Sequence, residues 1–211
     1  MPFMPAIKSL FFLSRLTFLL VLTLLCHAAQ AFSLQDLQQQ LAAHQTVQGD
    51  VQQKRFLRSL EQPLLSQGSF VMAADKGLLW ETRSPIASVI RITPKGMMHQ
   101  DSAGQWQPLQ QQGAGSQTQI RLFMDLLSGN TRSLSGQFTQ TLQGDAQDWT
   151  LTLDPTSSVL KQIFQRITIR GARSIEQVTL AETQGDRTEI LFSNVRINQP
   201  LPADAQHALE P

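Results

Sequence analysis

Hydrophobic and polar residues alternate along most of the chain. The pattern is clearest at Trp149, Leu151 and Leu153, which are separated by Thr150 and Thr152. A period of two is typical of a β-strand that packs one face and leaves the other in water. Such runs lie within residues 47–57, 70–74, 78–80, 88–93, 138–142, 149–153, 163–170, 178–180 and 190–192, with shorter ones at 97–100 and 105–109. The pattern predicts a sheet of roughly nine strands.

Turn-forming residues separate these runs at the spacing expected of β-hairpins. They lie at Gly77 and at residues 94–96, 102–104, 144–145, 170–171 and 185–186. Glycine, proline, serine and aspartate favour the backbone angles that reverse a chain. We expect longer connections at residues 59–67, around Pro63, and at 110–117. Strands joined by short turns pair with their neighbours, so the predicted sheet is an antiparallel meander.

Two segments have helical periodicity instead. Leu34, Leu37 and Leu41 are spaced as on one helix face, and Ser33 with Asp36 gives a start signal of the capping-box kind. We predict a helix from this start to about Gln45. A second amphipathic helix is predicted from Ile120, Phe123, Met124 and Leu127, and Gly129 favours its end there.

An antiparallel meander with two helices predicts an α+β protein with an open or partly closed barrel. No βαβ repeat occurs in the sequence. One-sided alternation over so many strands creates a wide apolar face, and two helices can cover only part of it. Either the sheet curls on itself or a cavity remains, and the pattern alone leaves both possibilities open.

The first 31 residues resemble an export signal. Lys8 and Arg15 precede an apolar run at residues 16–26, which Ala29-Gln30-Ala31 follows as a cleavage site. The run is shorter than the roughly 20 residues that a membrane-spanning helix needs. Lipid attachment at Cys26 is disfavoured because Leu25 is bulky. We therefore expect residues 1–31 to be a signal peptide that is removed, leaving one domain over residues 32–211.

Composition narrows the function. The 211 residues have 17 Lys and Arg against 16 Asp and Glu, without a concentrated basic face, so we do not expect a nucleic-acid partner. The one cysteine, Cys26, leaves with the signal peptide, so no thiol or disulfide is expected afterwards.

Candidate catalytic residues do not form a convincing set. His44, His99 and His207 lack the spacing of metal ligands, and Ser116 does not lie in a nucleophile elbow. We interpret the remaining charged residues, which include Asp145, Asp148, Asp154 and the arginines, as turn and surface charges. Arg166 and Arg170 share a strand face that could bind an acidic partner. We expect no metal, no cofactor and no enzymatic activity.

The order of elements resembles the periplasmic outer-membrane lipoprotein carrier family, as a divergent LolA-like member. Residues 47–53 (VQGDVQQ) resemble the first strand of that family, 68–80 its next hairpin, and 88–96, after Pro85, the segment that ends in a Gly-Lys-like turn. Leu153-Asp154-Pro155 and residues 175–202 resemble its Leu-x-Pro and terminal hairpin. The similarity covers nearly all of residues 32–211.

The resemblance implies a fold, a cargo and a route. The fold is a curved antiparallel sheet that forms an incomplete, half-open β-barrel with helices as a lid. Its apolar cavity would hold acyl chains of a lipid or lipoprotein that moves from an inner-membrane exporter to an outer-membrane acceptor, with the carrier acting as a periplasmic monomer. The residues that we expect to line the cavity are Phe70, Met72, Trp80, Ile90, Phe123, Met124, Leu127, Phe138, Trp149, Leu151, Ile167, Ile169, Leu180, Ile190 and Phe192.

Two points stay open after the resemblance. The family has an Arg-Pro pair after its second strand, which helps to set the closed state, and the matching residues here are Ala74 and Asp75. Related proteins of this superfamily also sense lipids while restraining a membrane-bound regulator. A lipid-sensing periplasmic interaction module is therefore the alternative function.

Overall fold

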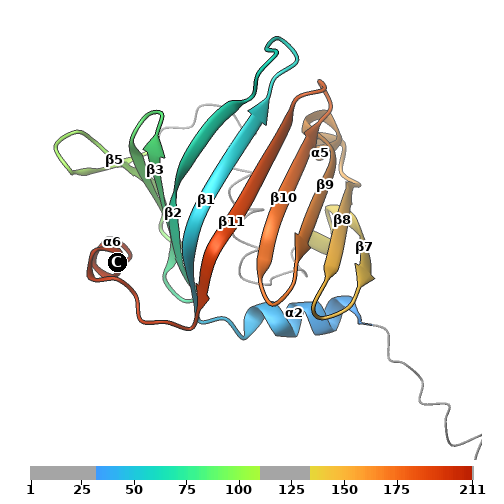
Figure 1. Ribbon diagram of the computed structural model, residues 1–211, viewed down its shortest axis with the longest axis horizontal. Helices are drawn as coiled ribbons and strands as arrows, with labels where there is room; N and C mark the ends of the chain where they lie inside the picture. The colour runs from blue at the N-terminus through green and yellow to red at the C-terminus, as the bar shows by residue number, and fades with distance from the viewer. Residues whose placement is uncertain (1–31, 110–133, 211) are drawn as a thin grey trace, which may run out of the picture. The chain divides into compact units, whose positions relative to one another are not determined.

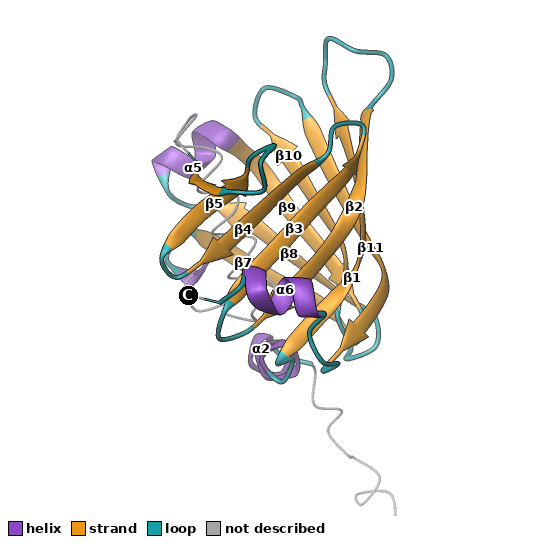
Figure 2. Ribbon diagram, turned by 90° about the vertical axis from the view of Figure 1, so that its left-hand side faces the viewer, coloured by secondary structure: helices purple, strands orange, loops and turns teal. Residues whose placement is uncertain are grey.

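The computed structural model describes residues 32–109 and 134–210. Eleven strands form one antiparallel sheet in the order β6-β5-β4-β3-β2-β1-β11-β10-β9-β8-β7, and no described ladder joins β6 to β7 (Figure 1). The strands are β1 (Thr46–Phe56), β2 (Leu64–Ala73), β3 (Gly77–Ser84), β4 (Ser88–Thr93), β5 (Gly96–Gln100), β6 (Trp106–Pro108), β7 (Phe138–Gly144), β8 (Trp149–Pro155), β9 (Phe164–Gly171), β10 (Ile175–Glu182) and β11 (Arg187–Ile197). Figure 2 shows the sheet curving, so that it has an inner and an outer face.

Alternation along each strand separates the two faces. On β8, Trp149, Leu151 and Leu153 are buried on the inner face, while Thr150 and Thr152 point to the outer face. The same inner face carries buried residues from β1, β2, β3, β9, β10 and β11, and these form one hydrophobic core cluster. The predicted α+β fold with an unclosed antiparallel sheet is therefore confirmed.

Helix α2 (Leu34–Ala42) begins as the sequence predicts. The hydroxyl of Ser33 accepts a hydrogen bond from the N–H of Asp36, and the Asp36 carboxylate accepts one from the N–H of Ser33. Leu37 and Leu41 are buried against the sheet. The helix crosses one end of the strands (Figure 1), which we call the α2 end.

Two boundaries differ from the prediction. Residues 64–67 belong to β2 and not to a loop, because the ladder with β1 continues as far as Leu64 opposite Arg55. Leu64 and Leu65 are both exposed, so this part of the strand has no alternating pattern. Ile163, which was expected in a strand, is instead the last residue of a short helix, α5 (Ser158–Ile163). At the start of this helix the hydroxyl of Ser157 accepts a hydrogen bond from the N–H of Leu160 at 3.2 Å.

A further short helix, α6 (Ala203–Ala208), was not predicted. It lies against the outer face (Figure 2), where Arg91 Nη1 donates a hydrogen bond to the carbonyl of Ala208 at 3.0 Å. Ala205 and Leu209 are buried. The signal segment 1–31, the connection at 110–117 and the helix expected at 120–127 lie outside the described residues.

Candidate functional site

Apolar side chains form rows across the inner face because paired strands place them opposite one another. Ile190, Val178, Ile169, Leu151 and Leu142 are successive partners across β11, β10, β9, β8 and β7. A second row crosses the other half of the sheet, from Phe70 on β2 through Trp80 and Ile90 to His99 on β5. The two rows together extend over nearly the full width of the sheet.

The two halves of the inner face differ in how completely they are covered. Trp149, Leu151, Ile167 and Ile169 on β8 and β9 are at most 1% exposed. Trp80 and Ile90, on β3 and β4, are only partly buried, as is Ile92. On β3 and β4 the apolar wall therefore still contacts solvent at Trp80, Ile90 and Ile92, as it does at Leu142 and Leu180 in the other half.

Aromatic side chains join the two halves. The ring centroids of Phe70 and Phe192 are 5.1 Å apart with the ring planes at 74°, and those of Trp80 and Phe192 are 6.5 Å apart at 87°. Edge-to-face contacts of this kind are favourable for aromatic rings. Phe192 on β11 therefore links the packed half of the inner face to the half that is partly exposed.

His99 is a polar residue within the second apolar row. It lies opposite Ile90, and its Nδ1 atom is buried without a hydrogen-bond partner among the described residues. The sequence indicated only that His99 lacks the spacing of a metal ligand. Met97 and Met98 are both apolar, so the hydropathy pattern carried no signal for the face of His99, which the strand register places beside Met97 on the inner face.

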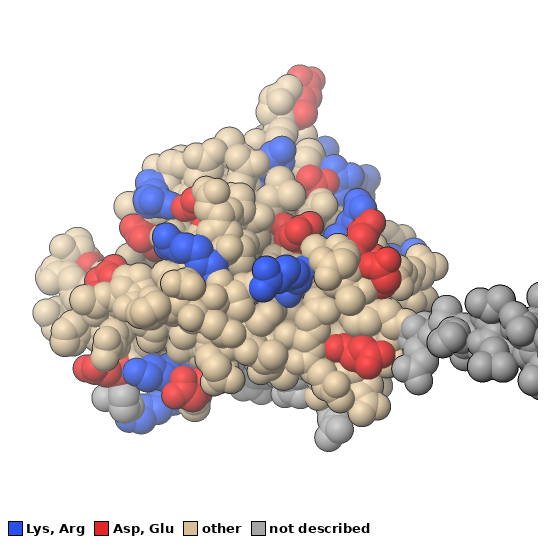
Figure 3. Space-filling view, turned by 60° about the horizontal axis from the view of Figure 1, so that its bottom comes forward, with Lys and Arg blue, Asp and Glu red and all other residues tan. Residues whose placement is uncertain are grey.

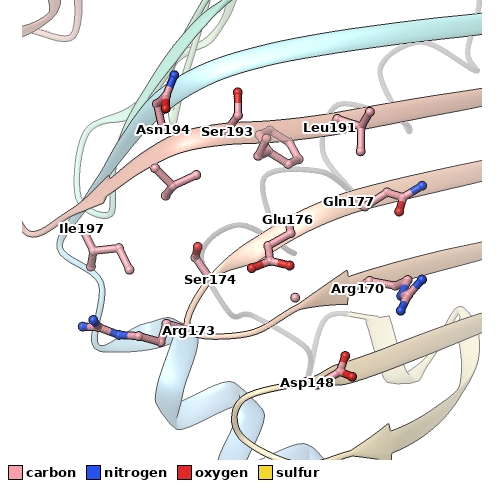
Figure 4. Close-up of a pocket in the computed structure, with 13 residues that line it drawn as sticks. Asp148, Arg170, Arg173, Ser174, Glu176, Gln177, Leu191, Ser193, Asn194 and Ile197 are labelled. Atoms are coloured by element: carbon pink, nitrogen blue, oxygen red, sulfur yellow. The ribbon is translucent and has the colours of Figure 1, made fainter.

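The outer face has a cleft of a different chemistry. β10 pairs with β11 only as far as Leu191, whereas β11 continues to Ile197, so the two strands separate toward the α2 end (Figure 4). The resulting cleft has a volume of about 740 Å³. Its lining comprises Asp148, Arg170, Gly171, Arg173, Ser174, Glu176, Gln177, Leu191, Phe192, Ser193, Asn194, Val195 and Ile197. Because charges of both signs surround it, the cleft is unlike the apolar inner face.

The surface charges are mainly paired or mixed. Arg166 Nε donates to Asp154 Oδ1 at 2.7 Å, and this hydrogen bond raises the pKa of Arg166. Arg166 is thus already engaged by a carboxylate, while Arg170 lies at the cleft. On the face that includes the α2 end, acidic and basic residues are interspersed (Figure 3).

Titratable residues do not assemble a metal centre in the described part of the chain. Asp145 acts in a turn, where its Oδ1 accepts hydrogen bonds from the N–H groups of Gln147 and Asp148. His44 is buried, and burial, followed by the positive charge of Arg173, lowers its pKa. Among the helices that the structure describes, none is both long and apolar enough to cross a membrane.

Comparison with known proteins agrees with this geometry. Residues 42–206 match the family model described as outer membrane lipoprotein carrier protein LolA. The chain belongs to the LolA family. An outer-membrane lipoprotein carrier protein of Pseudomonas putida (strain W619) is 28% identical over 188 residues, covering 85% of this chain and 83% of the relative. The resemblance inferred from the sequence is therefore confirmed.

Solved structures show a similar fold at low identity. A chain of the Pseudomonas aeruginosa MucA/MucB complex gives a TM-score of 0.50 at 12% identity, over 82% of this chain and 59% of that chain. This LolA-family chain therefore spans less than two thirds of that neighbour. A LolA superfamily protein from Nitrosomonas europaea gives a TM-score of 0.47 at 9% identity, over 86% of this chain and 99% of that one.

The cavity residues predicted for this LolA-family protein can be placed for the most part. Phe70, Met72, Phe138, Trp149, Leu151, Ile167, Ile169, Ile190 and Phe192 are buried in the core cluster, Trp80 and Leu180 pack against it, and Ile90 is partly buried beside Trp80. Phe123, Met124 and Leu127 lie outside the described residues. The described residues thus share one apolar face, and their contact with a lipid stays a prediction.

The positions matched to the family's Arg-Pro pair lie in the turn between β2 and β3. The N–H of Ala74 donates a hydrogen bond to the carbonyl of Gln45, just beyond α2, at 2.9 Å. Neither Ala74 nor Asp75 carries a guanidinium group. The family's arginine contact therefore has no donor at these positions.

Proposed function

We propose that this LolA-family protein is a periplasmic carrier that holds the acyl chains of a lipid or lipoprotein against the inner face of its sheet. The observation that carries the proposal is the partly exposed apolar wall at Trp80 and Ile90, which continues into a fully buried core. A partly exposed apolar wall offers a contact surface on which an apolar guest would be withdrawn from water.

The energetics favour such a wall. Each methylene group that is removed from water contributes about 0.8 kcal/mol to the free energy of binding. A lipid therefore needs a protein with an apolar binding surface to cross an aqueous gap. Release requires that the site be adaptable and not too tight. Met72, which packs beside this wall, has an unbranched and flexible side chain that suits this requirement.

The route follows from the same proposal. Residues 1–31 direct export and are removed, and residues 32–211 form the carrier domain. A protein of this family would receive its cargo from an inner-membrane exporter and pass it to an outer-membrane acceptor. It acts by binding and release and not by catalysis.

Acyl-probe binding by two adjacent variants tests the site. Ile90 and Val89 are neighbours on β4, both partly exposed, but Ile90 pairs with Trp80 on the inner face while Val89 pairs with Glu81 on the outer face. We expect Ile90→Asp to weaken binding of a fluorescent fatty-acyl probe at least tenfold, because it places a charge in the apolar wall. Val89→Asp is the matched control and should bind as the parent protein does.

Two further measurements decide the outcome. Thermal unfolding of both variants shows whether each remains folded, and solvent extraction of the protein purified from cells should yield acyl species by mass spectrometry. Equal probe binding by Ile90→Asp and Val89→Asp, or a protein that contains no lipid and takes up no probe, would contradict carriage.

The mixed-charge cleft gives a reason to keep one alternative. A lipid-sensing regulator of the same fold would bind a protein partner, and the opening between β10 and β11 offers charged groups and strand edges for such contact. Copurification of a partner in stable amounts, unchanged by Ile90→Asp, would favour the regulator over the carrier.

A further inference from the structure

Large apolar side chains are exposed at one end of the sheet. They are Leu60 (47% exposed), Leu64 (51%), Leu65 (45%), Ile86 (78%) and Val159 (62%), and we call them the apolar rim. Within the described ranges, these are all of the large hydrophobic residues that are exposed. Single exposed apolar residues are ordinary, but exposed apolar residues that all lie at the same end of a sheet indicate a contact surface.

Hydrogen bonds between the connecting segments show that the rim is at a single end. Arg58, in the β1–β2 connection, donates through its N–H to Asp186 Oδ1 and through Nη1 to the carbonyl of Gln184, both in the β10–β11 connection. Thr183 in that connection donates to the carbonyls of Gln162 and Ile163 in α5.

The remaining rim residue is placed by strand register. Ser84 lies opposite Gln67, so Ile86, two residues beyond the end of β3, extends from the sheet near the level of Leu64 and Leu65. Figure 1 shows these connections at the end of the strands opposite α2.

Basic residues outnumber acidic ones in the segments that carry the rim, although Glu189 on β11 lies opposite Lys54 and Glu182 ends β10 at the same end of the sheet. Residues 54–65, 83–88, 157–163 and 183–186 contain five basic residues, Lys54, Arg55, Arg58, Arg83 and Lys161, and two acidic ones, Glu61 and Asp186. Arg83 forms a salt bridge with Asp50 at 3.1 Å. No salt bridge joins the other four to a carboxylate in the part of the chain that the structure describes.

We propose that the apolar rim attaches this protein reversibly to an anionic phospholipid membrane surface. Exposed leucine and isoleucine tips can enter the boundary between headgroups and acyl chains, and adjacent basic residues attract acidic headgroups. The rim residues come from three separate parts of the chain, which are the β1–β2 connection with the start of β2, the β3–β4 connection, and α5, and the lining of the cleft in Figure 4 includes none of them. Separate tips with basic residues beside them fit a fluid lipid surface better than a single protein segment.

Vesicle flotation tests the proposal, with protein purified from cells that express the full chain. The proposal does not depend on lipid carriage. The vesicles contain phosphatidylethanolamine and phosphatidylglycerol, or phosphatidylcholine alone. We expect binding to the anionic vesicles, weakened at least tenfold in the double variant Leu60→Ser/Ile86→Ser and retained in Ile86→Leu. Arg55→Gln should weaken binding by roughly fivefold. Lys95→Gln, in the β4–β5 turn at the α2 end, should leave it unchanged.

The outcomes separate this surface from the proposed cavity. Ile90→Asp, which is aimed at acyl uptake, should still float with anionic vesicles. Absence of flotation by the parent protein would overturn the proposal and leave the rim to a protein partner. Flotation that is unaffected by the Leu60/Ile86 double variant, or equal on both kinds of vesicle, would also overturn it.

Discussion

Gly171 is the position where an added methyl group should most clearly disturb the packed half of the fold. It lies opposite Trp149 in the β8–β9 ladder. A Cβ atom at residue 171 would lie 2.6 Å from Cζ2 of Trp149 and would also clash with the carbonyl oxygen of Ser174. Both contacts are closer than real Cβ atoms make, so Gly171→Ala requires the indole ring and the β9–β10 turn to move.

Movement is resisted because this turn holds several elements together. The carbonyl of Ala172 accepts a hydrogen bond from Nε1 of Trp149 at 2.6 Å and another from Nε2 of Gln40 in α2, also at 2.6 Å. Overpacking in a core costs about 1–3 kcal/mol, and a clash with both backbone and ring belongs at the upper end. Replacing glycine by alanine also restricts the unfolded chain, which offsets roughly 0.4–1 kcal/mol. We therefore expect a net loss of about 2 kcal/mol.

Urea and thermal unfolding of Gly171→Ala and of a control variant, Gly136→Ala, measure this loss. For a domain of this size, 2 kcal/mol corresponds to a fall in Tm of roughly 4–8 °C. Gly136→Ala is the control, because a Cβ at residue 136 would have no neighbour within 4 Å. If Gly171→Ala unfolds at the same urea concentration as Gly136→Ala, the packing of Trp149 on the turn does not limit stability and the reasoning fails.

Two smaller effects follow from α2 and the residues just beyond it. Ser33→Ala removes the side chain that accepts the N–H of Asp36, so we expect the free energy of unfolding to fall by about 1 kcal/mol in urea titrations; an unchanged midpoint would contradict the role of the cap. Because burial and Arg173 lower the pKa of His44 below its ordinary value of 6.5, the unfolded chain binds the proton more readily, and this contribution to stability is complete above pH 6.5 and falls as the pH drops below it. Unfolding measured from pH 8 to pH 5 should show a shallower pH dependence for His44→Gln than for the parent protein, whereas equal slopes would count against it.

The strands could be predicted because a sheet with one packed face requires apolar and polar residues to alternate along each strand. Trp149, Leu151 and Leu153 alternate with polar neighbours, and all three are buried. The shorter runs predicted at residues 97–100 and 105–109 are also confirmed, as β5 and β6, and they bring the sheet to eleven strands. At the beginning of β2 the pattern failed, since Leu64 and Leu65 are both exposed although their backbones pair with β1.

The short helices and the cleft could not be predicted in this way. α5 and α6 each have six residues, too few for a helical period to show, and tertiary contacts such as the hydrogen bond from Arg91 to Ala208 hold α6 in place. The cleft depends on where the pairing of β10 with β11 stops, at Leu191. The exposed rim could not be predicted either. The hydrophobicity of Ile86 is the same whether the residue lies in the core or on the surface.

Stability and binding should be separable in this fold because different strands carry them. Trp149 on β8 is 1% exposed and is tied through Ala172 to α2, so a change there acts on the folded state as a whole. Ile90 on β4 is only partly buried, and its partner Trp80 reaches that packed region through Phe192. A substitution at residue 90 can therefore alter the apolar wall while the β8–β9 core remains intact. Gly171→Ala should lower the unfolding midpoint and leave acyl-probe affinity at temperatures well below that midpoint nearly unchanged, and Ile90→Asp should do the reverse. If both variants changed both properties in proportion, the inner face would be a single packed core, and the carrier proposal would lose its physical basis.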